Sequence, residues 1–207
     1  MAQVGRVILE REHEIAELAA AAQEAAAGSG SVVLVSGEAG IGKSVLAEAI
    51  RPVLPAEGRL LVGYCDDLAT RRTLGPIRDL IGSVGPALTG ALAEGRDRNQ
   101  LLEALRAELS WARQPTVLVI EDVHWADQAT LDVLHYLARR VAQLPLVLVL
   151  TYRDDEIGRE HPLRDLLGLV SRTDRVRRLP LARLSPEAVR RLSDGTTLDS
   201  RVVYELT

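Results

Sequence analysis

Eight consecutive residues have the types and the spacing of a phosphate-binding loop. They follow the pattern G-x-x-x-x-G-K-[ST] and are, in order, Gly37, Glu38, Ala39, Gly40, Ile41, Gly42, Lys43 and Ser44. In such a loop the glycines let backbone N–H groups turn toward phosphate oxygens, the lysine reaches the β- and γ-phosphates, and the hydroxyl binds Mg²⁺. The sequence therefore predicts a site for a nucleoside triphosphate and Mg²⁺, contacted by these residues and by Val45.

Lys43 is also distinguished by composition. It is the only lysine of the chain, whereas the other 24 basic residues are arginine. A sequence that otherwise uses arginine for positive charge thus makes one exception, at the position that the pattern requires. This makes a chance match to the pattern rare.

Two carboxylates, Glu121 and Asp122, end the apolar run that begins at Thr116. At a strand end one carboxylate can hold the Mg²⁺ shell while its neighbour orients an attacking water. ATPases with this loop usually place Asp first and Glu second, so the order is reversed here. We count Ser44, Glu121 and Asp122 as candidate metal ligands, with Glu121 for the metal and Asp122 for the water. Because the side chain of Asp122 is shorter than that of glutamate, we expect slow hydrolysis. The alternative to a catalytic pair is that Glu121 and Asp122 are solvated carboxylates of a turn.

A third candidate, Arg153, follows the apolar run Leu146 to Leu150. If that strand lies next to the strand before the loop, the guanidinium can contact a γ-phosphate bidentately. A surface arginine at a strand end is the alternative. Asp154, Asp155 and Glu156 favour a solvated acidic turn over a second metal site. The candidate catalytic residues are thus Lys43, Glu121, Asp122 and Arg153.

Further polar residues near the acidic pair favour structural roles. We expect Trp125 to pack beside His124, and Asp127 to cap a helix that begins near Gln128. The histidines have no metal-ligand spacing with Cys65, which argues against zinc and leaves Cys65 as a small buried hydrophobe.

Strands and helices must bring these residues to one edge. Short apolar runs predict five strands, which are Ser31–Ser36, Leu60–Tyr64, Thr116–Ile120, Leu146–Leu150 and Val176–Leu181. Helical stretches alternate with them and are expected at Glu10–Ala27, Pro76–Ser83 and Gln100–Trp111, with a Gly-rich break between the last two. Alternation of this kind predicts an α/β P-loop fold with a mostly parallel five-stranded central sheet flanked by helices, whose ligands bind at the carboxyl ends of the strands.

Three segments are expected along the chain. Residues 1–30 form an N-terminal helix and linker at the adenine edge, residues 31–183 form the core, and residues 184–207 begin a helical lid. Ser185 is expected as the N-cap of that lid helix and Pro186 in its first turn.

Composition narrows the class of protein. The net charge of −4 and the aromatic content of 3% disfavour a surface built mainly for nucleic acid. No apolar stretch reaches about 18 residues, and a single cysteine excludes an internal disulfide. We therefore expect a cytoplasmic protein that does not bind membranes.

Five segments together resemble the ATPase domain of STAND signal-transduction ATPases, above all the AAA-like module of large bacterial LuxR-type transcriptional regulators and related adenylate-cyclase-associated ATPases. They are LEREHEIAEL, VVLVSGEAGIGKS, GYCDDLATRRTLGPIRDL, VLVIEDVHWAD and LVLVLTYRDDE. The resemblance implies ATP as the nucleotide, a place for Arg11 near adenine, and a γ-phosphate sensor at Arg153. The family commonly has glycine where this chain has Glu10.

The resemblance also implies a function and its partners. It favours an ATP-dependent regulatory switch with slow hydrolysis to ADP, in a fragment of a larger regulator that contacts DNA only through effector domains outside this chain. A nucleotide-dependent homo-oligomer is compatible with it. Two alternatives remain open: an AAA-type ATPase whose steady turnover remodels a partner, and an origin-recognition-like nucleic-acid loader. The basic residues available to such a loader are Arg172, Arg175, Arg177 and Arg178.

Overall fold

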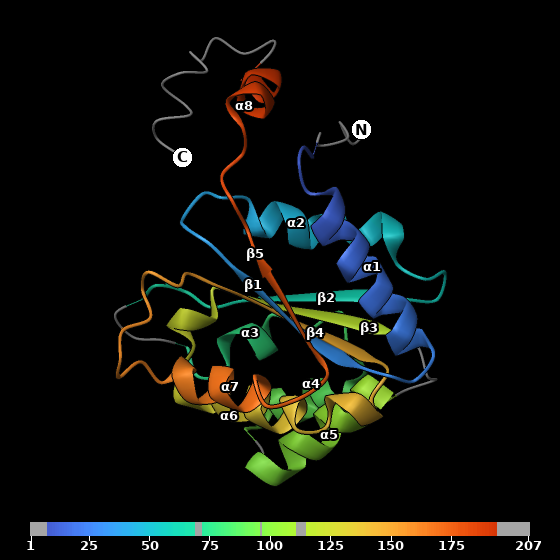
Figure 1. Ribbon diagram of the computed structural model, residues 1–207. Helices are drawn as coiled ribbons and strands as arrows, with labels where there is room; N and C mark the ends of the chain where they lie inside the picture. Colours follow the sequence, from blue (N-terminus) through green and yellow to red (C-terminus); the bar gives the residue numbers. More distant parts are fainter. Residues whose placement is uncertain (1–7, 69–71, 96, 111–114, 194–207) are drawn as a thin grey trace.

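Five parallel strands form one sheet in the order β2-β3-β4-β1-β5 (Figure 1). The computed structural model describes residues 8–68, 72–95, 97–110 and 115–193. The strands are β1 Ser31–Ser36, β2 Arg59–Tyr64, β3 Thr116–Glu121, β4 Leu146–Tyr152 and β5 Val176–Pro180. This sheet confirms the predicted α/β P-loop fold, and all of its strand pairings are parallel.

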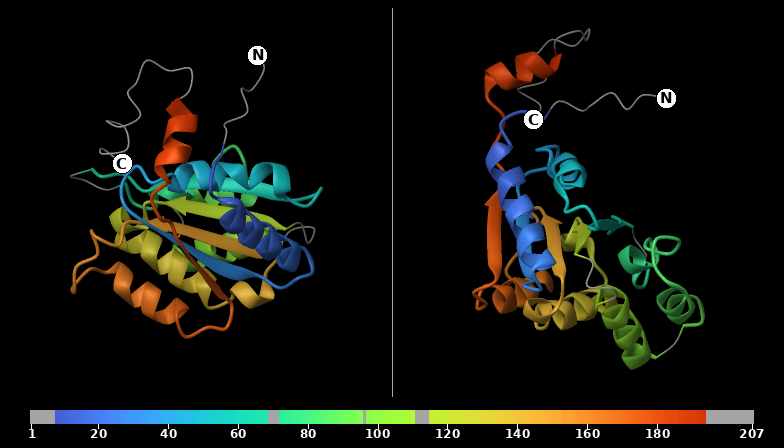
Figure 2. Two further views of the ribbon diagram at one scale, coloured as in Figure 1. Left: turned by 45° about the horizontal axis from the view of Figure 1, so that its top comes forward. Right: turned by 90° about the vertical axis from the view of Figure 1, so that its right-hand side faces the viewer.

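Helices cover both faces of the sheet (Figures 1 and 2). One face carries α1 Glu12–Ala26 and α2 Lys43–Ala49. The other carries α3 Gly75–Arg78, α4 Pro86–Ala93, α5 Arg98–Ser110, α6 Gln128–Ala138 and α7 Leu163–Val170. Short 3₁₀ helices lie at Arg51–Val53, Val123–Trp125 and Val141–Gln143. No helix of the described residues has both the length and the apolar character needed to cross a bilayer.

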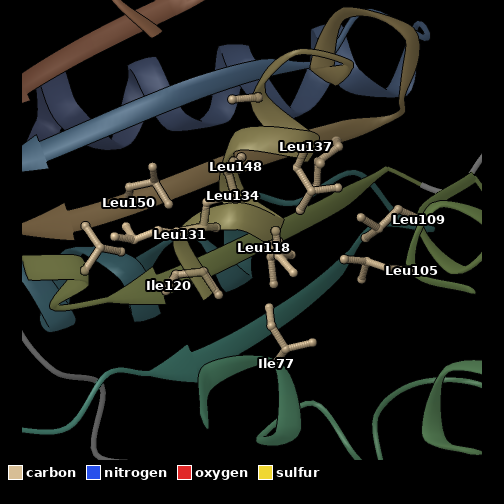
Figure 3. Close-up of a cluster of buried hydrophobic side chains, with 14 of the residues drawn as sticks. Ile77, Leu105, Leu109, Leu118, Ile120, Leu131, Leu134, Leu137, Leu148 and Leu150 are labelled. Carbon is tan, nitrogen blue, oxygen red and sulfur yellow. The ribbon is translucent and has the colours of Figure 1, made fainter. Parts of the chain in front are cut away.

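The central strands contribute to two separate cores, because successive side chains of a strand point to opposite faces. Leu118 and Ile120 of β3 belong to one core with residues of the helices α3 to α7. Figure 3 shows them beside labelled residues of α3, α5 and α6. Val117 and Val119 pack instead with α1 and α2. The apolar character of both sets of positions explains why the central strands are buried on both faces, as parallel strands usually are.

Gly63 of β2 allows α3 to lie directly against the edge strand of the sheet. A Cβ atom at this position would stand 2.1 Å from the carbonyl oxygen of Pro76. No side chain fits that distance, so glycine is required by the contact between strand and helix.

The segment between β2 and β3 differs from the prediction. The helix expected at Pro76–Ser83 ends at Arg78, and the region expected as a Gly-rich break holds α4. Pro86 occupies the first turn of α4, where its missing N–H costs nothing, and Leu88 and Leu92 are buried. Apolar burial thus stabilises a helix in a region where glycines had indicated a break. Trp111, the expected end of the next helix, lies outside the described residues.

The helix expected after Leu184 is α8, Pro186–Ser193, which stands apart from the two helical layers (Figure 2). Ser185 caps it, because its hydroxyl oxygen accepts a hydrogen bond from the Ala188 N–H at 3.1 Å. Residues 194–207, the remainder of the expected lid, lie outside the described part of the chain.

Candidate functional site

The predicted phosphate loop connects the end of β1 to the start of α2. Gly40 and Gly42 have φ angles of 73° and 101°, in the left-handed region that glycine adopts without strain. Gly42 is the N-cap of α2 and Lys43 is its first residue. The loop therefore ends at a helix N-terminus, where backbone N–H groups and the helix dipole favour an anion.

The side chain of Lys43 lies within the loop rather than in solvent. Its residue is only 7% exposed, and its Nζ donates to the carbonyl oxygens of Gly37 and Glu38 at 2.8 Å each. Burial lowers the pKa of the ammonium group, while the charge of Asp122 acts in the opposite sense. An anion bound beside a buried ammonium group of this kind stabilises its charged form.

Ser44 and Glu121 are joined by a hydrogen bond in which the serine hydroxyl donates to Oε2 of the carboxylate. Glu121 ends β3 and is 4% exposed. Burial raises the pKa of this carboxyl, the Ser44 hydrogen bond lowers it, and the charge of Asp122 raises it further. The hydroxyl and carboxylate fit Mg²⁺, which combines few protein oxygens with phosphate oxygens and waters.

Asp122 lies at a backbone position that is unusual for a residue with a side chain. Its φ and ψ angles are 53° and 47°, and its N–H donates to Oγ1 of the buried Thr151 at 2.9 Å. The hydrogen bond from the end of β3 to β4 holds this left-handed conformation. Asp122 thereby lines the same cleft as Lys43 and Ser44.

The cleft has a volume of about 310 Å³. It is lined by residues from the phosphate loop, from the end of β3 and from the end of β4, which are Ala39, Gly40, Gly42, Lys43, Ser44, Val45, Asp122 and Arg153. The sheet order explains the convergence, because β4 lies between β3 and β1 and all three strands end at the same edge. Three of the four candidate catalytic residues line the cleft directly. The fourth, Glu121, is joined to it by the hydrogen bond from Ser44.

Arg153 does not stand free at the strand end. Its Nη1 donates to Oε1 of Glu156 at 2.6 Å, and its Cζ lies 4.8 Å from the centre of the Trp125 ring. Glu156, which the sequence indicated as part of a solvated acidic turn, thus contacts a residue of the cleft. No local pattern distinguished it from Asp154 and Asp155.

The structural interpretation of the residues after Asp122 is confirmed for Asp127. Its carboxylate accepts from the Ala129 and Thr130 N–H groups at 3.2 and 3.3 Å, and so caps α6. His124 is 1% exposed and packs on Trp125 with ring centres 4.6 Å apart. Burial lowers the pKa of His124, although the charge of Asp122 opposes the shift.

A second cavity, of about 250 Å³, opens beside the loop and is mostly apolar. Its lining is Ile8, Leu9, Arg11, Gly40, Gly42, Val45, Leu46, Leu184 and Leu192. Sequence reasoning selected only Arg11, Gly40, Gly42 and Val45 from this set. The apolar residues just before Arg11, and the apolar side of the helix after Leu184, were the signals that could have identified the rest.

Arg11 is itself a structural link at this cavity. Its guanidinium donates to the carbonyl oxygens of Glu10, Ile41 and Ala182, at 2.9, 3.3 and 2.7 Å. These bonds join the N-terminal segment, the phosphate loop and the chain after β5.

Glu10 adopts a backbone conformation that is unusual for a residue with a side chain. Its φ angle is 57°, in the region that glycine prefers. The carboxylate accepts from the N–H of Ser185 at 2.7 Å and from its hydroxyl. Glutamate thus gains a contact with the start of α8 that glycine cannot make.

Within residues 8–68, 72–95, 97–110 and 115–193, no group of three His, Cys, Asp or Glu side chains could hold a metal ion. Cys65 is buried, at 6% exposure, as expected of a small hydrophobe.

Known proteins are similar to this chain in sequence and in fold. Residues 7–150 match the AAA ATPase domain family. An uncharacterized protein of Rhizobium meliloti (strain 1021) is 30% identical over 194 residues, in a match that covers 73% of this chain and 19% of the relative. The chain therefore spans a small part of that relative's length.

Three solved structures share the fold. The ORC1 protein of Aeropyrum pernix in complex with DNA has a TM-score of 0.65 and 18% identity, over 91% of this chain and 49% of that one. A Walker-type ATPase of Pyrococcus abyssi has a TM-score of 0.57 and 17% identity, over 96% and 62%. A STAND protein of Pyrococcus horikoshii with a tetratricopeptide repeat sensor has a TM-score of 0.51 and 19% identity, over 97% and 28%.

The match over residues 7–150, with the phosphate loop and the sheet in the positions described, shows that this chain belongs to the AAA ATPase domain family.

Proposed function

We propose that this chain is an ATP- and Mg²⁺-binding switch that hydrolyses ATP slowly to ADP and phosphate. The observation that carries the proposal is the cleft lined by Lys43, Ser44, Asp122 and Arg153, in which Ser44 is hydrogen-bonded to Glu121. These groups supply a phosphate ligand, a metal site, a water-orienting carboxylate and a γ-phosphate contact in one place.

Each residue has a separate part in the proposed reaction. Lys43 and the loop N–H groups bind the β- and γ-phosphates, while Ser44 and Glu121 hold Mg²⁺. Bound Mg²⁺ neutralises charge on the phosphate oxygens. Asp122 orients a water whose oxygen bonds to the γ-phosphorus as the bond from that phosphorus to the ADP oxygen breaks, and the proton that the water loses passes to the released phosphate. Arg153 contacts the transferred group.

Slow turnover follows from the position of Asp122. Its carboxylate is one methylene shorter than that of the glutamate usually found second in such pairs, and the Thr151 hydrogen bond fixes its backbone. The carboxylate therefore has little freedom to approach the attacking water.

The apolar cavity beside the loop is the proposed adenine site. Leu192 of α8 and Leu184 line it together with Ile8 and Leu9. A base in this cavity would contact both the core and the start of the proposed lid, residues 184–207. Nucleotide binding would thereby favour one position of α8 relative to the sheet.

The chain between β5 and α8 has further links to the nucleotide loop. Arg183 donates from Nη2 to Oε2 of Glu38 at 2.6 Å, and Arg11 bonds both Ile41 and Ala182. A change in the conformation of the phosphate loop would therefore alter the contacts of the segment that leads into α8. We propose that this coupling carries the nucleotide state from the core, residues 31–183, to effector domains.

The proposed context is a LuxR-type transcriptional regulator in which DNA is bound by domains outside this chain. A nucleotide-dependent homo-oligomer forms part of this proposal. The similarity in fold to a STAND protein with a sensor domain, and in sequence to a much longer relative, supports the part of this proposal that places the chain in a larger multidomain protein.

A nucleic-acid loader is the second candidate, favoured by the fold similarity to an ORC1 protein in complex with DNA. The arginine cluster supports it weakly, because Arg175, Arg177 and Arg178 already have hydrogen-bond partners within the protein. Arg177 binds Glu17 and Glu24, and Arg178 binds the Ser171 hydroxyl.

Binding and turnover of the 207-residue chain test the proposal. We expect Mg²⁺-dependent binding of ATP that Lys43→Ala abolishes, whereas Arg164→Ala, at an exposed site on α7, leaves it unchanged. Steady-state turnover should stay below roughly 1 s⁻¹. Faster turnover would favour the remodelling ATPase, and unchanged ATP binding by Lys43→Ala would refute nucleotide binding at this loop.

A further inference from the structure

Three side chains that the proposed reaction does not use surround Arg153 at the end of β4. Glu156 binds its Nη1 through Oε1 at 2.6 Å, and Trp125 lies beneath the guanidinium at 4.8 Å. The Nε2 atom of the buried His124 lies 3.4 Å from the second oxygen, Oε2, of Glu156. His124 also accepts the backbone N–H of Arg153 on its Nδ1, at 3.4 Å. The four side chains thus form one connected group.

The contacts determine which edge of the guanidinium is held. Glu156 binds Nη1, which lies on the opposite side of the group from Nε–H. Within the described part of the chain, the buried Nε of Arg153 has no hydrogen-bond partner. Arginine binds phosphate bidentately through two parallel N–H groups, and the edge formed by Nε and Nη2 offers such a pair. A buried donor without an acceptor is costly, so an anion in the cleft that Arg153 lines would stabilise this edge once it turns toward the cleft.

Glu156 is suited to a holding role. The pKa of its carboxyl lies below the usual value: burial acts to raise it, but the hydrogen bond from Arg153 and the charge of His124 lower it. Its Oε1 accepts the Arg153 hydrogen bond, which defines its orientation, while its Oε2 lies 3.4 Å from Nε2 of His124 without a hydrogen bond between them in the described part of the chain. Rotation of the guanidinium is further limited by the face of Trp125.

We propose that Glu156, supported by His124 and Trp125, is a positioning residue that holds Arg153 with its Nε and Nη2 edge toward the terminal phosphate of ATP. This inference rests on the proposed function, because it assigns to Glu156 the orientation of the proposed γ-phosphate contact. ADP lacks that phosphate. The preference for ATP over ADP therefore depends on Glu156 although Glu156 does not touch the nucleotide.

The affinities of the chain for ADP and for a non-hydrolysable ATP analogue, both with Mg²⁺, test the inference. Arg153→Ala should lower the preference for the triphosphate by about tenfold, the usual effect of losing a hydrogen bond to a charged group. Glu156→Gln, which keeps the shape of the side chain, should lower it by a similar factor and leave ADP affinity unchanged. The double variant should lose no more than either single variant, because both remove one interaction.

Glu160→Gln, four residues further along the same exposed loop, is the matched control and should retain the preference. The unchanged ADP affinity of Glu156→Gln shows that the variant is folded, and Glu156→Ala provides a second test of the same loss. A raised preference for ATP in Glu156→Gln would show that Glu156 competes with the phosphate for Arg153. An unchanged preference would show that Glu156 has no role in it. Either result overturns the inference. If Arg153→Ala itself retains the preference, the proposed sensor fails as well.

Discussion

The hydroxyl of Ser44 donates a hydrogen bond to Oε2 of Glu121, across 77 residues of sequence and across the intervening strand β4. The bond joins the first turn of α2 to the end of β3. Because one partner is a metal ligand in the phosphate-loop pattern and the other a carboxylate in a buried position, the pair defines where Mg²⁺ is expected.

Replacing Ser44 by alanine should weaken ATP binding about tenfold in the presence of Mg²⁺, because the variant lacks one metal ligand and leaves Glu121 without its donor. Titration with and without a chelator measures the effect, which should disappear when Mg²⁺ is removed. Ser110→Ala is the control, since that exposed hydroxyl donates to the Arg106 carbonyl of its own helix. An equal loss with and without Mg²⁺ would show that Ser44 does not act through the metal.

The two carboxylates at the end of β3 should differ in what their neutral variants lose. Glu121→Gln is expected to lose Mg²⁺-dependent affinity for ATP. Asp122→Asn is expected to bind normally but to turn over at least about 100-fold more slowly, the usual contribution of a group that activates a nucleophile. Affinity and single-turnover rates separate the two effects. The opposite pattern would exchange the roles of the two residues, and normal behaviour of both variants would remove them from the site.

Glu121→Gln should also raise the free energy of unfolding of the protein without nucleotide. Burial raises the pKa of Glu121 in the folded state above the ordinary value of 4.5, so ionisation at neutral pH destabilises the fold. The folded state binds more protons than the unfolded state just above pH 4.5, and the advantage of the variant should shrink as pH falls toward that value. Urea unfolding of both proteins at several pH values tests this. A constant difference would exclude the ionisation of Glu121 as its cause.

Gly63→Ala should destabilise the protein by about 3 kcal/mol, because an added methyl group forces β2 and α3 apart. The new Cβ would lie 2.1 Å from a backbone oxygen of Pro76, which cannot rotate away. Gly168→Ala, within α7, meets nothing within 4 Å and should stabilise the helix slightly. Urea unfolding of the two variants compares them, and similar stabilities would contradict the close contact.

The sequence predicted the elements whose signals are local. The loop pattern, the five apolar runs and the cap at Ser185 each lie within a few residues, and the strands and the capped helix were found near the predicted bounds. A purely local signal also had limits. Glycines at Gly82 and Gly85 indicated a break, but the burial of Leu88 and Leu92 against distant residues stabilises α4.

By itself, then, the sequence determined the fold class and the phosphate loop, because covalent neighbours and the period of apolar residues suffice to specify them. Only the tertiary structure decided what surrounds Arg153 and what Arg11 and Glu10 contact. Glu156 follows two other acidic residues, Asp154 and Asp155, and contacts Arg153 three residues before it, but its place beside His124 depends on the ends of β3 and β4 lying together. Arg11 and Glu10 likewise bind Ala182 and Ser185, more than 170 residues away. Contacts of that separation depend on the assembled sheet, and no local pattern encodes them.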